Sequence, residues 1–98
     1  MRRIVFTKHA EAMMVKRGLS KESVINVLEA PSKRYLDTRS GYLIAIKNQD
    51  NTAIVVVYDL VEEHIEVVTA FKVSEVDRLI RSRVSKRYWV EIDENTIR

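Results

Sequence analysis

The order of apolar and polar residues predicts a helical first third. Arg2–Phe6 is short and rich in β-forming side chains, which predicts a first strand. A helix is expected to begin after Thr7, a good N-cap, and to run to about residue 17, because Gly18 suits the left-handed conformation that ends many helices. A second helix is expected from the cap Ser20 to about residue 29, before Pro31.

The middle of the chain has strand character. Four apolar or alternating runs are separated by turn residues: Lys33–Arg39, Tyr42–Lys47, Ala53–Leu60 and His64–Lys72. Ser40 and Gly41 are a two-residue hairpin signal between the first two runs. Ala53–Leu60 is apolar on both faces, which is typical of an interior strand. These runs predict a four-stranded antiparallel meander.

The last part of the chain returns to helix. Ser74 is expected to cap a helix, with Asp77 completing a box-like cap. The apolar stripe of this helix consists of Val76, Leu79, Ile80 and Val84. Tyr88–Ile92 alternates enough to form a further strand or a docked extension, in which Trp89 contacts either its own core or a second copy. We therefore predict a single α+β domain spanning residues 1–98, with residues 87–98 as a C-terminal extension.

Composition describes an ordinary globular chain with uneven charge. The 98 residues are 46% hydrophobic and 32% charged, without cysteine, signal peptide or membrane-spanning run, so we expect a cytoplasmic protein. Residues 1–34 hold eight Lys/Arg against three Asp/Glu, residues 35–77 hold three against eight, and residues 78–88 hold five and no acid. If the two basic blocks meet, they form a positive surface suited to nucleic acid; otherwise they solvate helix faces. The high charge and single glutamine are also features of heat-adapted proteins.

The first predicted helix carries the best candidates for chemistry. His9 and Lys16 are seven residues apart and share a helix face, and Arg17 lies beside it. His9 is a candidate proton-transfer group and Arg17 a candidate phosphate clamp, as metal-free RNA cleavage requires. The alternative is structural: His9 caps or packs in the first turn, and Arg17 compensates the helix C-terminus.

Other candidates lie in the strands. Lys47 and Lys72 stand near strand ends, from which they are expected to reach an open sheet face, or merely to solubilise the ends. Tyr42 is a candidate for base stacking or proton donation, although such tyrosines also fill sheet faces. The two histidines and scattered acids have no metal-ligand spacing, and no Gly-rich phosphate loop occurs. We therefore expect no metal and no cofactor.

Three short motifs carry a resemblance to a known family. His9-Ala10, the run from Arg17-Gly18 to Leu19-Ser20, and Pro31 resemble the opening of a small family in the RelE/ParE-like toxin superfamily, to which BrnT-type toxins are related. Val67–Lys72 resembles that family's last strand, so the resemblance covers roughly residues 4–72. The sequence departs from the pattern at Met13, where an arginine is typical, and this departure bears on catalysis more than on the fold.

The resemblance implies a small α+β fold with two helices on one face of a sheet, whose open face binds RNA and an antitoxin protein. It also implies RNA cleavage without metal. For such an enzyme, the residues themselves suggest His9 as the catalytic proton-transfer group, with Arg17 and Lys72 stabilising phosphate. Nucleic-acid contacts are expected from Lys16, Tyr42, Lys47, Arg78 and Arg81. The first alternative is a non-catalytic nucleic-acid-binding module. The second is a protein-interaction domain, which forms a homodimer or pairs with a partner strand.

Overall fold

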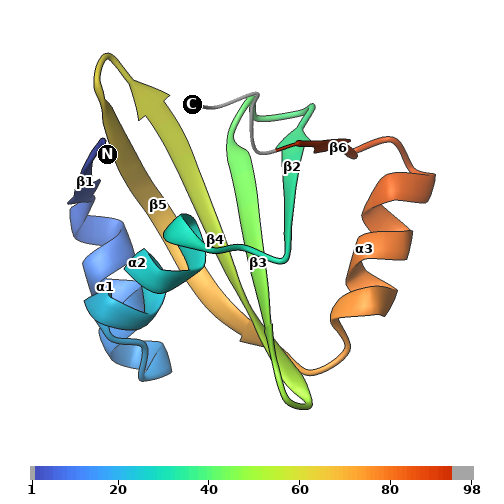
Figure 1. Cartoon of the computed structure of the whole chain (residues 1–98), viewed down its shortest axis with the longest axis horizontal. Helices are drawn as coiled ribbons and strands as arrows, with labels where there is room; N and C mark the ends of the chain where they lie inside the picture. The colour runs from blue at the N-terminus through green and yellow to red at the C-terminus, as the bar shows by residue number, and fades with distance from the viewer. Residues whose placement is uncertain (1, 94–98) are drawn as a thin grey trace.

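The computed structural model describes residues 2–93, which form one mixed sheet with three helices (Figure 1). In chain order the elements are β1 (Arg3–Phe6), α1 (Lys8–Arg17), α2 (Lys21–Glu29), β2 (Lys33–Asp37), β3 (Leu43–Gln49), β4 (Thr52–Val61), β5 (His64–Val73), α3 (Val76–Ser85) and β6 (Trp89–Ile92). The predicted α+β class is therefore confirmed.

The sheet has six strands in the order β1-β5-β4-β3-β2-β6. β1 runs parallel to β5, with Arg3 opposite His64, and the other neighbours are antiparallel. The C-terminal segment is part of the sheet, because β6 pairs with β2 and places Trp89 opposite Asp37. The sheet is thus wider than a four-stranded meander, and β6 is a true strand rather than a loosely docked extension.

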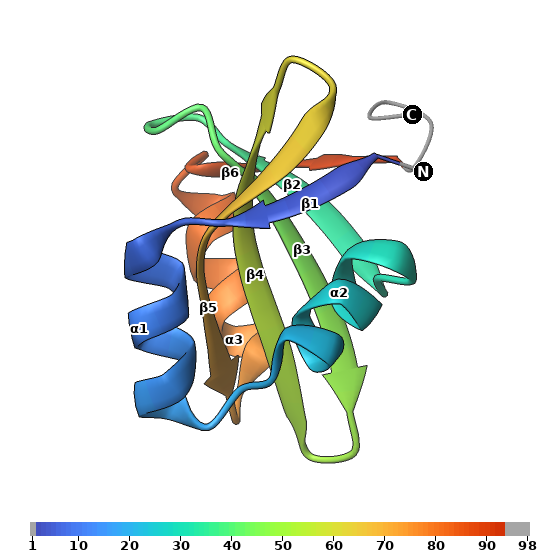
Figure 2. The same ribbon diagram turned by 90° about the vertical axis from the view of Figure 1, so that its left-hand side faces the viewer.

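The helices lie on both sides of the sheet (Figures 1 and 2). α1 and α2 cover one face, which we call the α1/α2 face; its core includes Met14, Val27, Val56 and Val67. α3 covers the opposite face, the α3 face, where Val76, Leu79 and Ile80 of its predicted stripe pack on a second core, whereas Val84 is exposed. The open face implied by the resemblance is therefore absent from the described part of the chain, because α3 and its apolar residues occupy it.

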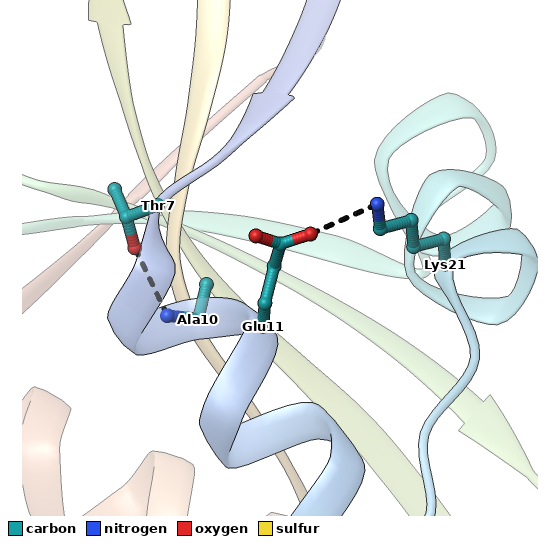
Figure 3. Close-up of polar contacts among 4 residues, drawn as sticks. All are labelled: Thr7, Ala10, Glu11 and Lys21. Atoms are coloured by element: carbon teal, nitrogen blue, oxygen red, sulfur yellow. Dashed lines mark hydrogen bonds and ion pairs between the residues drawn. The ribbon is translucent and has the colours of Figure 1, made fainter.

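Three of the expected helix caps are present. The Thr7 side-chain oxygen accepts a hydrogen bond from the backbone N–H of Ala10 at 3.0 Å (Figure 3). Gly18 ends α1 with φ of 69°, in the left-handed region that costs glycine little. Ser20 accepts a hydrogen bond from the N–H of Ser23 at 3.1 Å and begins α2. The sequence therefore predicted both N-terminal caps and the break between the helices.

Two local predictions are wrong. α3 begins at Val76, and its N-cap residue Glu75 makes no side-chain capping hydrogen bond, so the box expected from Ser74 and Asp77 does not form. The β2–β3 connection is also longer than two residues.

Asp37 organises that longer connection, since its Oδ1 accepts hydrogen bonds from the N–H groups of Arg39 and Ser40 at 2.9 and 3.2 Å. Burial alone raises the pKa of the Asp37 carboxyl, but these two bonds, the neighbouring Trp89 side chain and the Arg39 charge hold it below its ordinary value. The carboxylate thus stays ionised while it closes the turn.

A β-bulge interrupts the pairing of β4 with β5. Val57 lies opposite Thr69 and Tyr58 opposite Val67, which leaves Val68 as the extra residue. Val67 and Ala70 consequently both face α1 and α2, although strict alternation would put them on opposite faces. The bulge sets which β5 side chains reach each face of the sheet.

Candidate functional site

Arg17 forms hydrogen bonds with the part of β5 that does not pair with β1. β1 pairs only with residues 64–67 of β5. Beyond them, Nη1 of Arg17 donates to the backbone oxygen of Ala70 at 2.9 Å and to Oγ1 of Thr69 at 3.2 Å. Its guanidinium carbon also lies 5.9 Å from the centre of the Phe71 ring. Arg17 is nevertheless exposed, so its remaining N–H groups are accessible to a ligand.

Lys47 and Lys72 stand in one row across the sheet. Lys47 lies opposite Ile54 on β4, and Ile54 lies opposite Lys72 on β5. Because directly opposite residues share a face, both lysines are on the α1/α2 face with Ile54. Two strand spacings put their Cα atoms about 10 Å apart. The expectation that they reach an open face is therefore wrong, since they lie on the face that the two helices partly cover.

Arg17, Lys47 and Lys72 together form a feature that we call the basic row. The Arg17 guanidinium contacts Ala70, two residues before Lys72 on β5. Lys47 Nζ lies 3.3 Å from the Asn26 side-chain oxygen of α2. Within residues 2–93 the ion pairs join Lys21 to Glu11, Lys33 to Glu91 and Arg78 to Glu75, so none of them neutralises the row. Three uncompensated cations at one end of the sheet create a positive potential.

His9 lies apart from the basic row. It is exposed in the first turn of α1, and within residues 2–93 its side chain makes no hydrogen bond or ion pair. The helix rise puts its Cα about 12 Å from that of Arg17. Lys16, also exposed, shares its helix face as predicted. An ion pair of 3.0 Å between Glu11 and Lys21 joins α1 to α2 (Figure 3).

The second basic block lies on the other side of the molecule. Arg78 and Arg81 are exposed on α3 and line an open depression of about 440 Å³ beside the β3–β4 turn. Glu75 and Asp77 line it too, and Arg78 is 3.3 Å from Glu75. α1 and α3 flank opposite faces of the sheet (Figure 1). The two basic blocks therefore do not merge into the single surface considered from the sequence.

Tyr42 is also separate from the basic row. It is half-buried before β3, and its backbone N–H donates to Oγ of Ser40 at 3.1 Å. Five residues of extended strand separate it from Lys47 by about 17 Å. The structure thus gives Tyr42 a place in the β2–β3 turn.

Arg34 is a buried polar residue that the sequence does not predict. It is only 9% exposed. Its Nη1 donates to the Tyr58 hydroxyl at 2.7 Å and its Nη2 to the backbone oxygen of Leu28 at 2.6 Å. Burial raises the pKa of the Tyr58 phenol, while the Arg34 charge and hydrogen bond and the Arg2 charge partly oppose that rise. The available signal was the register of β2, which puts Arg34 on the same face as Leu36.

Arg34 connects the end of α2 to the sheet. The Leu28 carbonyl belongs to the last turn of α2, whose carbonyls lack helical partners. A cation there also complements the helix dipole. Nε of Arg34 has no hydrogen-bond partner among the described residues. We assign Arg34 a structural role, because its donors point at internal groups.

Two features do not occur among the described residues. Within residues 2–93, no group of three or more His, Asp or Glu side chains is close enough to hold a metal ion. In the same part of the chain, none of the helices has the length and hydropathy needed to cross a bilayer.

Comparison with known proteins gives one match. The family model described as a domain of unknown function (DUF4258) matches residues 6–72. No curated protein and no solved structure matches the chain. The matched segment contains the whole basic row and His9, whereas α3 and β6 lie outside it.

Proposed function

The chain belongs to the DUF4258 family, whose model covers more than half of it, and from that premise we propose that the protein binds single-stranded RNA through the basic row. The observation that carries the proposal is the alignment of Lys47 and Lys72 across β3, β4 and β5, with Arg17 beside them. Phosphate oxygens are the natural partners of such cations, and the spacing of the row fits an extended backbone better than one compact anion.

A relationship to RelE/ParE-like toxins is part of the same proposal. Its support is the consecutive antiparallel order of β2 to β5 and the two N-terminal helices on one face of the sheet. An antitoxin partner and a cytoplasmic location are proposed with it. In this protein α3 covers the other face, so an RNA or antitoxin site would lie on the α1/α2 face or around the sheet edge.

Removing one lysine of the row tests the binding proposal. We expect Lys72→Ala to weaken binding of a short unstructured RNA roughly tenfold, because one charge-assisted contact is lost. The slope of log K against log salt should also fall by about 0.7 for each phosphate contact removed. Fluorescence anisotropy at several salt concentrations measures both quantities.

Two matched variants locate the surface. Lys33→Ala removes the same charge at a place where Lys33 is 3.7 Å from Glu91, and it should leave binding unchanged. Arg81→Ala tests the depression beside α3 and should also have no effect. Loss of binding in Arg81→Ala, with Lys72→Ala unaffected, would move the site to α3 and refute the basic row.

Metal-independent cleavage of RNA is a second proposal, in which His9 is the proton-transfer group. Its support is that His9 is exposed, without a hydrogen-bond partner among residues 2–93, and on the same helix face as Lys16. We expect slow cleavage in the presence of EDTA, lost in His9→Ala, while RNA binding is retained. A product gel run beside the binding titration measures both activities. Wild-type protein that binds RNA without product would reject cleavage and leave a binding module.

A further inference from the structure

The two edges of the sheet differ in whether other parts of the chain cover their backbone groups. At the β5 edge, the N–H of Thr7 donates to the Val67 oxygen at 3.1 Å. Further along, Arg17 donates to the Ala70 oxygen at 2.9 Å. β1 and α1 lie alongside this edge of the sheet (Figure 2). The β5 edge is therefore protected against pairing with another strand.

The β6 edge has no such protection among the described residues. The N–H of Thr38 donates to the oxygen of Tyr88 at 2.8 Å, which fixes the direction of the backbone groups at the start of β6. Because these directions alternate in an antiparallel pair, Val90 and Ile92 turn their N–H and C=O groups toward β2. Those of Trp89 and Glu91 point outward, and no strand of residues 2–93 lies beyond them.

The side chains of this edge are apolar on one face and charged on the other. Val90 is 49% exposed and lies on the α1/α2 face, opposite Leu36 of β2. On the α3 face, Glu91 neighbours Trp89, and the Arg83 guanidinium lies 6.0 Å from the Trp89 ring centre. The edge thus offers an apolar residue and an anion on β6, with the Arg83 cation of α3 beside them.

We propose that two copies of the chain pair through β6 in antiparallel orientation, so that the two sheets become continuous. In the register that we infer, Val90 lies opposite Val90 of the partner subunit as a non-hydrogen-bonded pair. Trp89 lies opposite Glu91 of the partner subunit as a hydrogen-bonded pair, and this satisfies the outward backbone groups. Glu91 then approaches Arg83 of the partner subunit, so the charges are complementary.

The neighbouring registers are less favourable. Centring the two-fold axis on Glu91 would place two carboxylates directly opposite each other, which destabilises a strand pair. An odd shift would pair residues from opposite faces and bring Val90 against Glu91 of the partner subunit. Self-complementarity therefore selects a second copy as the occupant of this edge, with Val90 on the axis.

Cysteine cross-linking tests the register directly, because the chain contains no cysteine. In a non-hydrogen-bonded pair the two Cα atoms are about 4.5 Å apart, within the range that a disulfide accepts. We expect Val90→Cys to form a disulfide-linked dimer under mild oxidation roughly tenfold faster than Glu91→Cys, whose partner positions are out of range. Non-reducing electrophoresis follows the reaction, and light scattering coupled to size exclusion measures the mass of the wild type against concentration.

A second pair of variants separates dimerisation from folding. Val90→Lys places two like charges on the axis and should give a folded monomer, judged by circular dichroism. Val90→Thr keeps the branched shape and should remain dimeric. A wild type that is monomeric at every concentration overturns the proposal and leaves the edge to a strand of another protein. Equal cross-linking of the two cysteine variants overturns the register.

Discussion

Arg34→Ala is expected to lower the free energy of unfolding by about 3–5 kcal/mol. The substitution removes both hydrogen bonds of a side chain that is only 9% exposed. It leaves the Tyr58 hydroxyl and the Leu28 carbonyl buried without their partner, and each such group costs about 1–3 kcal/mol. The lost packing of the arginine methylenes adds to this. Urea unfolding followed by circular dichroism measures the change.

A double variant distinguishes this explanation from a simple loss of volume. Arg34→Met fills most of the space but leaves the Tyr58 hydroxyl unpaired. Tyr58→Phe removes that hydroxyl but leaves Nη1 of Arg34 buried without an acceptor. We expect the combined variant to be less destabilised than the sum of the two single variants, because it removes both partners. Strict additivity, or a cost of Arg34→Ala below about 1 kcal/mol, would contradict the proposed role of the pair.

Trp89→Ala alone is expected to lower the free energy of unfolding by about 3–5 kcal/mol, as large-to-small changes of buried aromatic residues do. Trp89 is 5% exposed, and its ring centre is 5.4 Å from that of Tyr35. It also lies opposite Asp37, which closes the β2–β3 turn. Loss of the ring should loosen β6 and the apolar stripe of α3 together, because both pack on the same core.

Hydrogen exchange should show this coupling. We expect amides of β6 and α3 to lose protection in Trp89→Ala, while those of α1 and β5 keep theirs. Trp89→Phe retains a ring and should cost less than the alanine variant. Val15→Ala is a suitable control, since Val15 is 83% exposed and its truncation should stay within about 0.5 kcal/mol. Uniform loss of protection throughout the chain would contradict a separate core on the α3 face.

Local chemistry explains what the sequence could predict. Thr7, Gly18 and Ser20 act on their own turns through caps and a left-handed residue, so neighbouring residues suffice to identify them. Trp89 was expected to contact either its own core or a second copy, because a large aromatic ring is rarely left in water, and in the structure it is buried in its own core. α3 was located by its apolar stripe, although its cap was assigned to the wrong residue.

The errors concern relations between distant segments. The face reached by Lys47 and Lys72 depends on the register of three strands, and the β5 register beyond Thr69 depends on a bulge that no residue type announces. His9 and Arg17 were considered together because both belong to the first helix, but they lie at opposite ends of α1. The burial of Arg34 was not predicted, because a charged residue in a strand ordinarily faces solvent. Its hydrogen-bond partners also come from two other elements, α2 and β4.

The parallel pairing of β1 with β5 has a consequence for synthesis of the protein. Arg3–Phe6 can pair with its partner strand only after His64–Val67 has left the ribosome. The opposite edge closes only after Trp89–Ile92, which is made after the other five strands. Each edge of the sheet therefore waits for a strand far along the chain, and until then the nascent chain depends on α1 and α2 to shield apolar side chains.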